Sequence, residues 1–302
     1  MSPARGDAKL VTMMVDEVLT FTGGPGGPLR SPVMLIALSG LFDMASVATT
    51  TVNRFAPADR ALTVARIDPD PFYDFTQHRP EIAIHGGTST IRWPENRFDL
   101  VRDRGGRDLI ILVGVEPDLA WATYAGAIAT VAQHLGCGAV VTVGSAAEAV
   151  PHTRTPLVTG STTDATLARR LGIGQPTYEG ITGVIGVLHA DLDRRGIPAV
   201  SLRVGVPHYL LDAEHPQAVA ALQRHLSHVL GVPVADDGGQ LAAAIEHWAT
   251  RYAQRVADDP HLGVYAHMLE EGYDRRTEAS IPSPDDLGAA FEDFLRSQNP
   301  DT

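Results

Sequence analysis

The residues that could do chemistry in this chain lie just after its predicted strands. Ligands of an open α/β sheet bind beyond the carboxyl ends of the strands, because loops and helix N-termini converge there. These positions, with two loops rich in proline and aromatic residues, give eight candidates for a cleft or a contact surface: Asp43, Tyr73, Asp74, Arg79, Glu116, Ser145, His208 and Tyr209. Nucleophilic, acid–base and metal chemistry each require a different arrangement of these residues.

Nucleophilic hydrolysis would rest on Ser145, which follows the predicted strand 139–143. A nucleophile elbow needs glycines around the serine so that its strained turn can form. Ala147 stands where the second glycine belongs. The sequence therefore favours a turn at the strand end, with Ser145 capping the next segment, over a catalytic serine.

Acid–base chemistry would use Asp43 and Glu116, which could converge at one edge of the sheet. Asp43 precedes a predicted helix, and aspartate at that position accepts backbone N–H bonds as an N-cap. Asp118 could cap the helix that follows it, and this leaves Glu116 free. We keep two interpretations of Glu116 open, a structural role and a place in a functional cleft.

The two aromatic loops have three possible roles. They contain Phe72, Tyr73 and Arg79 in one case and His208 and Tyr209 in the other. Tyr and Arg are favoured at the centres of protein interfaces, whereas aromatic rings bury large areas wherever they lie. The loops could form a pocket wall, contact a partner or pack on their own core.

Metal and disulfide chemistry find little support. Among twelve histidines, His225 and His228 form the close pair, and zinc needs three or four ligands. Cys137 is the single cysteine, which excludes an intrachain disulfide and suits a reducing cytosol. We predict no metal, no cofactor and no catalytic residue.

Charge and hydropathy restrict the partners and the location. The net charge of −12 disfavours phosphate backbones and anionic lipid, so we expect neither nucleic acid nor membrane as a partner. The sequence contains no apolar run long enough for a signal peptide or a membrane span. We expect a cytoplasmic protein.

Alternating strands and helices must position these residues. Apolar runs predict buried strands at 33–38, 109–115, 139–143 and 199–204, a further strand at 62–67, and a hairpin from 82–85 and 89–93 that turns at Gly86-Gly87. Stripes at helical spacing predict helices within 119–135, 181–192 and 219–229. The pattern is typical of a three-layer α/β/α sandwich with a mostly parallel sheet.

A helical arm is predicted after this core. Leu241, Ile245, Trp248, Tyr252 and Val256 share one helix face, and further helices are expected from Pro260 and within 283–294. We divide the chain into an N-terminal segment and linker (1–30), a core domain (31–235) and a C-terminal helical arm (236–302). The aromatic stripes of the arm must bury themselves against the core or another subunit.

Four short motifs occur in order along the core: Gly40 to Asp43, Asp74 to Pro80, Gly114 to Pro117 and Pro207 to Tyr209. In this order they resemble the PAC-two family of proteasome assembly chaperones, in its actinobacterial-type branch. The resemblance implies a core similar to that of nucleoside phosphorylases, self-association as a trimer and no established catalytic activity. It also implies protein partners such as proteasome subunits. The chain ends at Thr302 without the hydrophobic-tyrosine docking motif of eukaryotic members, so we do not expect its tail to dock into a proteasome ring.

Two functional hypotheses remain. The first is an oligomeric interaction or assembly protein that we expect to be non-enzymatic, because no complete catalytic constellation is present. The alternative is a phosphorylase-like or hydrolase-like enzyme, or a small-molecule binder, with a cleft near Arg79, Glu116 and His208. A polar cleft with perturbed carboxylates would favour the second, and contact with a neighbouring subunit would favour the first.

Overall fold

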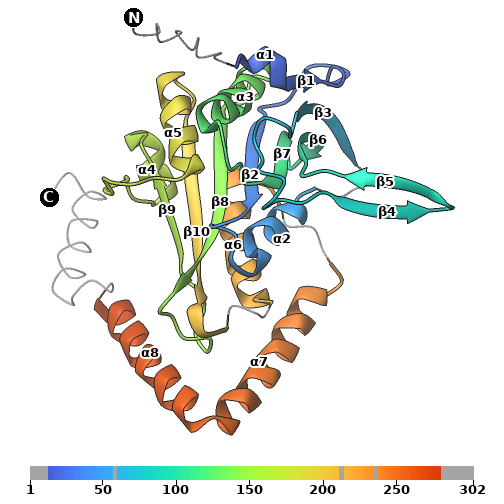
Figure 1. The fold of residues 1–302 in the computed structure, drawn as a ribbon. Coiled ribbons are helices and arrows are strands. Elements are labelled where there is room, and N and C mark those ends of the chain that lie inside the picture. The colour runs from blue at the N-terminus through green and yellow to red at the C-terminus, as the bar shows by residue number, and fades with distance from the viewer. Residues whose placement is uncertain (1–12, 57–59, 211–213, 234–236, 280–302) are drawn as a thin grey trace, which may run out of the picture.

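The chain folds around a mixed eight-stranded sheet with helices on both faces (Figure 1). The computed structural model describes residues 13–56, 60–210, 214–233 and 237–279. Across the sheet, the strands follow the order β1 (Leu19–Phe21), β3 (Ala61–Ile67), β6 (Asn96–Arg104), β7 (Arg107–Val115), β2 (Val33–Ser39), β8 (Ala139–Glu148), β10 (Ala199–Pro207) and β9 (Val158–Thr162). The central strands β7, β2, β8 and β10 run parallel, which confirms the predicted α/β/α class. Antiparallel pairs extend both flanks.

Two helical layers enclose the sheet. One layer contains α1 (Val15–Val18), α3 (Trp121–His134) and α5 (Val184–Arg194), and the other contains α2 (Val47–Asn53) and α6 (Pro216–Leu230). The remaining short helices are η1 (Met44–Ser46), α4 (Ala165–Leu171) and η2 (His208–Leu210). Right-handed crossover helices place the loops that follow the central strands at a single edge of the sheet.

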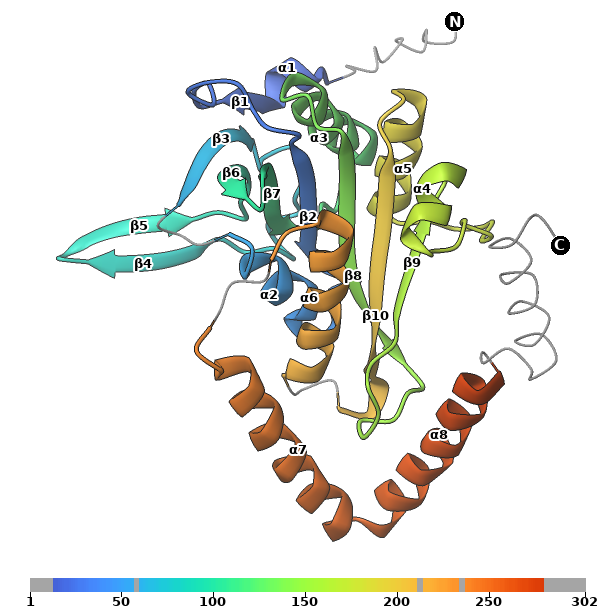
Figure 2. The ribbon, with the colours of Figure 1, turned by 180° about the vertical axis from the view of Figure 1, so that it is seen from behind.

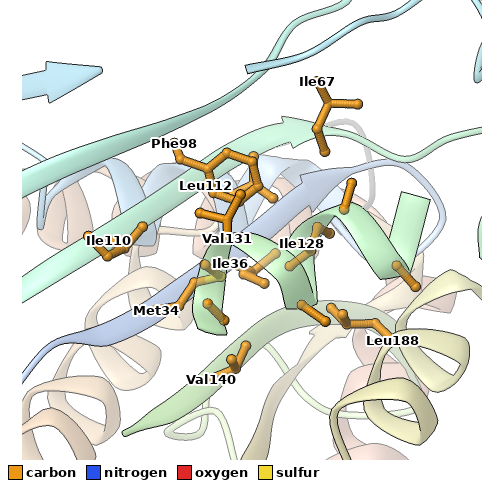
Figure 3. Close-up of a cluster of buried hydrophobic side chains, with 14 of the residues drawn as sticks. Met34, Ile36, Ile67, Phe98, Ile110, Leu112, Ile128, Val131, Val140 and Leu188 are labelled. Atoms are coloured by element: carbon orange, nitrogen blue, oxygen red, sulfur yellow. The ribbon is translucent and has the colours of Figure 1, made fainter. Parts of the chain in front are cut away.

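Successive side chains of β2 point to opposite faces of the sheet, so this one strand packs against both helical layers. Met34 and Ile36 enter the cluster under α3 and α5 (Figure 3), whereas Leu35 and Ala37 enter the cluster under α2 and α6. All four side chains are buried. A strand covered on both faces has no polar side, and this is why its sequence is an unbroken apolar run.

The structure adds elements that the sequence analysis did not predict. Strands β1, β6 and β9 and helix α4 are new, and β8 and β10 each extend several residues beyond their predicted ends. Part of the N-terminal segment, residues 15–21, joins the fold because β1 pairs with β3. The division of the chain into domains stays a prediction.

The predicted hairpin, β4 (Glu81–His85) and β5 (Thr88–Arg92), forms a separate two-stranded sheet. Gly86 and Gly87 both have positive φ, 56° and 83°, as a tight two-residue turn of type I′ requires. Figures 1 and 2 show the hairpin projecting sideways from the body of the molecule. Every residue in it except Ala83 is exposed.

The arm consists of α7 (Gln240–Asp258) and α8 (Pro260–Ala279). The two helices form a V that points away from the body, and the lower ends of β8, β9 and β10 point between its limbs (Figure 2). Trp248 and Tyr252 of the predicted stripe are buried with Leu210 in a cluster separate from the two main cores. The stripe therefore packs on its own chain. The predicted helix within 283–294 lies outside the described residues.

Candidate functional site

The loops beyond the carboxyl ends of β2 and β7 contain unusual backbone conformations. Ala45, Ser46 and Ala120 have positive φ values of 52–55° although none is glycine. A non-glycine residue in this region costs about 1–3 kcal/mol, and such residues gather at functional sites. These loops, residues 40–46 and 116–120, are the part of the structure where the candidate site lies.

Asp43 is a buried helix cap. Its Oδ1 accepts the N–H groups of Ala48 (2.8 Å) and Thr49 (3.2 Å), and its Oδ2 accepts the hydroxyl of Thr49 (2.6 Å). The carboxylate thus satisfies donors in the first turn of α2, as the capping interpretation predicts. Because these bonds use both carboxylate oxygens, Asp43 fixes the conformation of the loop 40–46 relative to α2.

Replacing Asp43 by alanine should lower the free energy of unfolding by about 2 kcal/mol, because buried N–H groups of α2 lose their acceptor. Asn keeps one acceptor oxygen, so Asp43→Asn should cost about half as much. The exposed Asp70→Ala change is the matched control and should stay within about 0.5 kcal/mol. Urea unfolding measures all three. Equal stabilities for Asp43→Ala and the control would show that the cap is dispensable.

Ser145 lies inside β8 and not in a turn after it, because β8 continues to Glu148. Its side chain is fully buried. Its hydroxyl donates to the carbonyl of Met44 (3.0 Å), and its N–H donates to the carbonyl of Phe42 (2.7 Å). Ser145 therefore fastens the loop 40–46 to the sheet.

Glu116 fastens the same loop from the other side. Its Oε2 accepts the N–H of Leu41 (2.9 Å), and its own N–H donates to the carbonyl of Ser39 (2.9 Å). A Cβ atom at Gly40 would collide with this carboxylate, so only glycine permits the approach. The side chain of Glu116 is half-buried. These hydrogen bonds show the structural role of Glu116, which is one of the two interpretations that the sequence left open.

Tyr73 anchors the neighbouring loop through a buried polar network. Its hydroxyl donates to the carbonyl of Val115 (2.7 Å) and accepts the amide of Asn96. The Asn96 Oδ1 in turn accepts the hydroxyl of Tyr124 (2.9 Å) and the N–H of Val115 (3.1 Å). Burial raises the pKa of Tyr73 and of Tyr124 above the usual value, so both phenols stay protonated and can donate.

Sequence reasoning missed Asn96, which ties both tyrosines together. A single asparagine outside any motif carries no recognisable signal. Gly114 is the one indirect sign of Asn96 in the sequence, because a side chain at position 114 would overlap the Asn96 amide oxygen. The close approach becomes visible only once β6 and β7 are paired.

Asp74 and Asp118 organise the exposed side of this loop. Asp118 Oδ2 accepts the N–H of Asp74 (2.8 Å) and lies 2.9 Å from His78 Nδ1. The expectation that Asp118 caps the next helix is therefore wrong, and α3 starts without a side-chain cap. Hydrogen bonds from Thr76 lower the pKa of Asp74. Arg79, also in this loop, is exposed.

His208 and Tyr209 lie in a different place, at the junction with the arm. His208 Nδ1 lies 3.0 Å from the carbonyl of Glu148, and its Nε2 lies 2.9 Å from the hydroxyl of Tyr265 in α8. Because Nδ1 faces a carbonyl oxygen, Nδ1 is the atom that donates there, and Nε2 is left to bond the Tyr265 hydroxyl. The Tyr209 hydroxyl accepts the N–H of His152 (2.9 Å). Burial raises the pKa of Tyr209 to about 12.

Ion pairs extend this junction along α8. Arg154 makes two parallel hydrogen bonds to Asp274, at 2.9 and 2.8 Å, and lies 3.7 Å from Glu270. The Tyr273 hydroxyl donates to the carbonyl of Thr155 (2.7 Å). These bonds lower the pKa of Asp274 and, through Thr153, that of Glu270. The arm is thus joined to the loop between β8 and β9 by directed contacts.

The structure separates the candidates into two groups. Asp43, Tyr73, Asp74, Glu116 and Ser145 surround the ends of β2, β7 and β8, whereas His208 and Tyr209 contact the arm. Within the described residues, Arg79 and His208 make no hydrogen bond or ion pair to Glu116. In the same part of the chain, no three His, Cys, Asp or Glu side chains group to hold a metal ion.

Exposed apolar side chains occur in the loops next to Glu116. Leu41, Phe42, Leu119 and Ile181 are exposed, Ile181 at 95%. Phe42 and Glu116 both lie beside Gly183, which follows Ile181 by two residues in the sequence. We call these four side chains the apolar patch. Exposed apolar side chains that gather beside structured loops mark contact surfaces for proteins.

Comparison with known proteins settles the family. The model described as the PAC2 family matches residues 37–256, which is most of the chain. The chain belongs to the PAC2 family. Its crystallised relatives in the family include a PAC2 family protein from Streptomyces avermitilis, with 32% identity and a TM-score of 0.71 over 78% of this chain and 99% of that one.

A second similar structure has a more informative name. The Mycobacterium tuberculosis proteasome-assembly chaperone homologue Rv2125 shares 34% identity, with a TM-score of 0.68 over 78% of this chain and 99% of its own. PbaB from Pyrococcus furiosus, an archaeal proteasome activator, shares 19% identity and a TM-score of 0.59 over 80% of this chain and 98% of its own, which shows the fold alone. No curated protein matches this chain.

The PAC2 fold of this chain includes no helix, among the residues described, that is both long and apolar enough to cross a bilayer. Cys137 is buried, and burial raises the pKa of its thiol to about 12. A thiol with such a pKa is unreactive near neutral pH.

Proposed function

We propose that this PAC2 family protein is a homo-oligomeric assembly protein of the cytoplasm, a trimer, that contacts other proteins such as proteasome subunits and does so without enzymatic chemistry. The similarity to a proteasome-assembly chaperone homologue at 34% identity supports the class of function. The name describes the mycobacterial protein, and its extension to this chain is our proposal.

The proposal rests on the hydrogen bonds that the polar candidate residues make. Asp43, Glu116 and Ser145 each hold a loop through hydrogen bonds to backbone groups. A carboxylate or hydroxyl committed to positioning a loop is poorly placed to exchange protons with a substrate. The loops so held present Leu41, Phe42 and Leu119 of the apolar patch, and burial of these side chains would favour association with a protein.

An enzyme or small-molecule binder would need an enclosed space beside these groups. One small cavity of about 10 Å³ lies at the junction between the body and the arm, bordered by His152, His215 and Trp248. An open hollow lies on the sheet beside Asn53 and Arg97. Neither is lined by Glu116 or His208, and this weighs against the alternative hypothesis.

The partner is tested with purified proteasome subunits. The full-length chain, mixed with separately expressed actinobacterial α- and β-subunits, should co-elute with one of them and should speed the appearance of assembled, peptidase-active particles. Size-exclusion chromatography with light scattering and a peptidase assay measure both effects. Subunits that assemble at an unchanged rate and never co-elute with an intact oligomer of this chain would refute the proteasome partner.

A further inference from the structure

Trp248 in α7 has a buried hydrogen-bond donor without a partner. The residue is 6% exposed, and its ring packs among those of His152, His215 and Tyr252, with centroids 6.0, 5.4 and 4.9 Å away, respectively. Within the part of the chain that the structure describes, the indole Nε1–H reaches no acceptor. An unpaired buried N–H group is costly, and native proteins satisfy nearly all such groups with a protein acceptor or with ordered water.

A cavity of suitable size adjoins Trp248. The cavity at the junction between the body and the arm has a volume of about 10 Å³, and Trp248, His152 and His215 are among the residues that line it. One water molecule needs roughly 10–15 Å³, whereas organic ligands bind in pockets of roughly 300–1,000 Å³. The space therefore suits a single water and is too small for an organic ligand.

The two histidines of the cavity supply further polar partners. His215 Nε2 lies 2.8 Å from the carbonyl of Leu210, so Nε2 carries the proton and Nδ1 of the neutral ring is an acceptor. His152 Nδ1 lies 2.7 Å from the hydroxyl of Tyr209. Burial lowers the pKa of both histidines, so both rings are neutral at pH 7.5. Among the described residues, His152 Nε2 and His215 Nδ1 have no hydrogen-bond partner, so each ring keeps one nitrogen available.

We propose that one water molecule occupies this cavity and bonds the arm to the body. The water accepts the Nε1–H of Trp248, donates to Nδ1 of His215 and takes Nε2 of His152 as its third partner. Buried waters make about three hydrogen bonds, so these three groups are sufficient to hold it. Trp248 then fixes α7 by a directed bond as well as by packing, and the water is part of the docked structure.

The indole N–H of Trp248 reports this water directly in nuclear magnetic resonance. The isotope-labelled full-length chain has three tryptophans and gives three indole signals, and Trp248→Phe identifies the signal that belongs to Trp248. At pH 7.5 this signal should show a dipolar cross-peak to water, with the sign that a long-lived bound water gives. Trp121 is the matched control, because its Nε1 donates to the carbonyl of Pro117 (2.7 Å) and should show no such cross-peak. A Trp248 signal that is silent, or that only exchanges its proton with solvent, would overturn the inference.

His215→Gln tests the acceptor in the same experiment. A glutamine amide can keep the bond to the Leu210 carbonyl, but it has no counterpart of Nδ1. The water cross-peak of Trp248 should therefore weaken at least about twofold, because the water loses one of about three hydrogen bonds. His247→Gln, at an exposed position of α7, should leave the cross-peak unchanged. Equal cross-peaks in the two variants would show that His215 does not hold the water.

A crystal structure of the full-length chain at pH 7.5 gives the geometry. It should place a water oxygen about 2.7–3.2 Å from Trp248 Nε1 and from His215 Nδ1. A cavity without electron density, or an indole N–H that points onto the face of the Tyr252 ring instead, would contradict the proposed water site.

Discussion

Truncation after Val234 should leave a folded, cooperative α/β body. The two main cores contain buried side chains from the sheet and from α1, α2, α3, α5 and α6, whereas Trp248 and Tyr252 of the arm lie in a separate cluster with Leu210. Circular dichroism should therefore lose the helical signal of α7 and α8 and retain that of the remainder. The strand content should not change.

The truncated body should nevertheless melt earlier, by roughly 5–10 °C, because a loss of a few kcal/mol shifts the midpoint of a domain of this size by that amount. Removal of the arm uncovers Leu210 and His215, which are almost completely buried, and breaks the pair between Arg54 and Asp237. Differential scanning calorimetry gives the midpoint and the cooperativity.

Trp248→Ala in the intact chain is the companion measurement. It should raise amide exchange throughout α7 and α8 and leave the sheet protected, because a deleted aromatic side chain costs about 3–5 kcal/mol where it was buried. His247→Ala, at the exposed neighbouring position, should change neither. A truncated chain that is unfolded would place the arm within the core and would refute the boundary at 235.

Acidification from pH 7.5 to pH 5 should release the arm before the sheet unfolds. His152 and His215 are buried at the junction, where their rings lie 6.0 and 5.4 Å from that of Trp248. Burial lowers the pKa of both below the ordinary value of 6.5. Glu270 opposes the shift at His152 but is the smaller influence.

The direction in which pH changes the stability of docking follows from proton linkage. Well above pH 6.5 both rings are neutral whether the arm is docked or not, so protonation does not weaken docking. Below pH 6.5 the undocked form binds more protons, and docking weakens by up to about 1.4 kcal/mol per pH unit for each histidine until the pH passes the lowered pKa. A second loss follows at lower pH, when Asp274 and Glu270, whose pKa values are depressed by their hydrogen bonds, become protonated.

Small-angle X-ray scattering measures the release as an increase in the radius of gyration between pH 7.5 and pH 5. His152→Gln/His215→Gln removes the titrating groups, so its radius should vary much less over that range. His247→Gln changes an exposed histidine of the arm and should behave as the wild type does. A constant radius for the wild-type chain, or an identical transition in the double variant, would contradict the mechanism.

Local sequence determined the elements whose burial follows a simple period. The apolar runs of β2 and β7 specified strands covered on both faces, and the stripe through Trp248 and Tyr252 specified the inward face of α7. The pair Gly86-Gly87 specified the hairpin turn. In each case, the pattern reports the geometry of neighbours along the chain, which needs no knowledge of distant residues.

Only the tertiary structure decided which residues those buried faces pack against. The stripe of α7 could have covered another subunit, but contacts with Leu210 and the loop of His152 place it on its own body. The network that joins Tyr73 to Tyr124 passes through Asn96, far from both in sequence. Strand β6, which contains charged residues at 97, 99 and 102–104, becomes a strand through pairing with β3 and β7. Periodicity tells which face of an element is buried, whereas its partner depends on long-range packing, which no local pattern encodes.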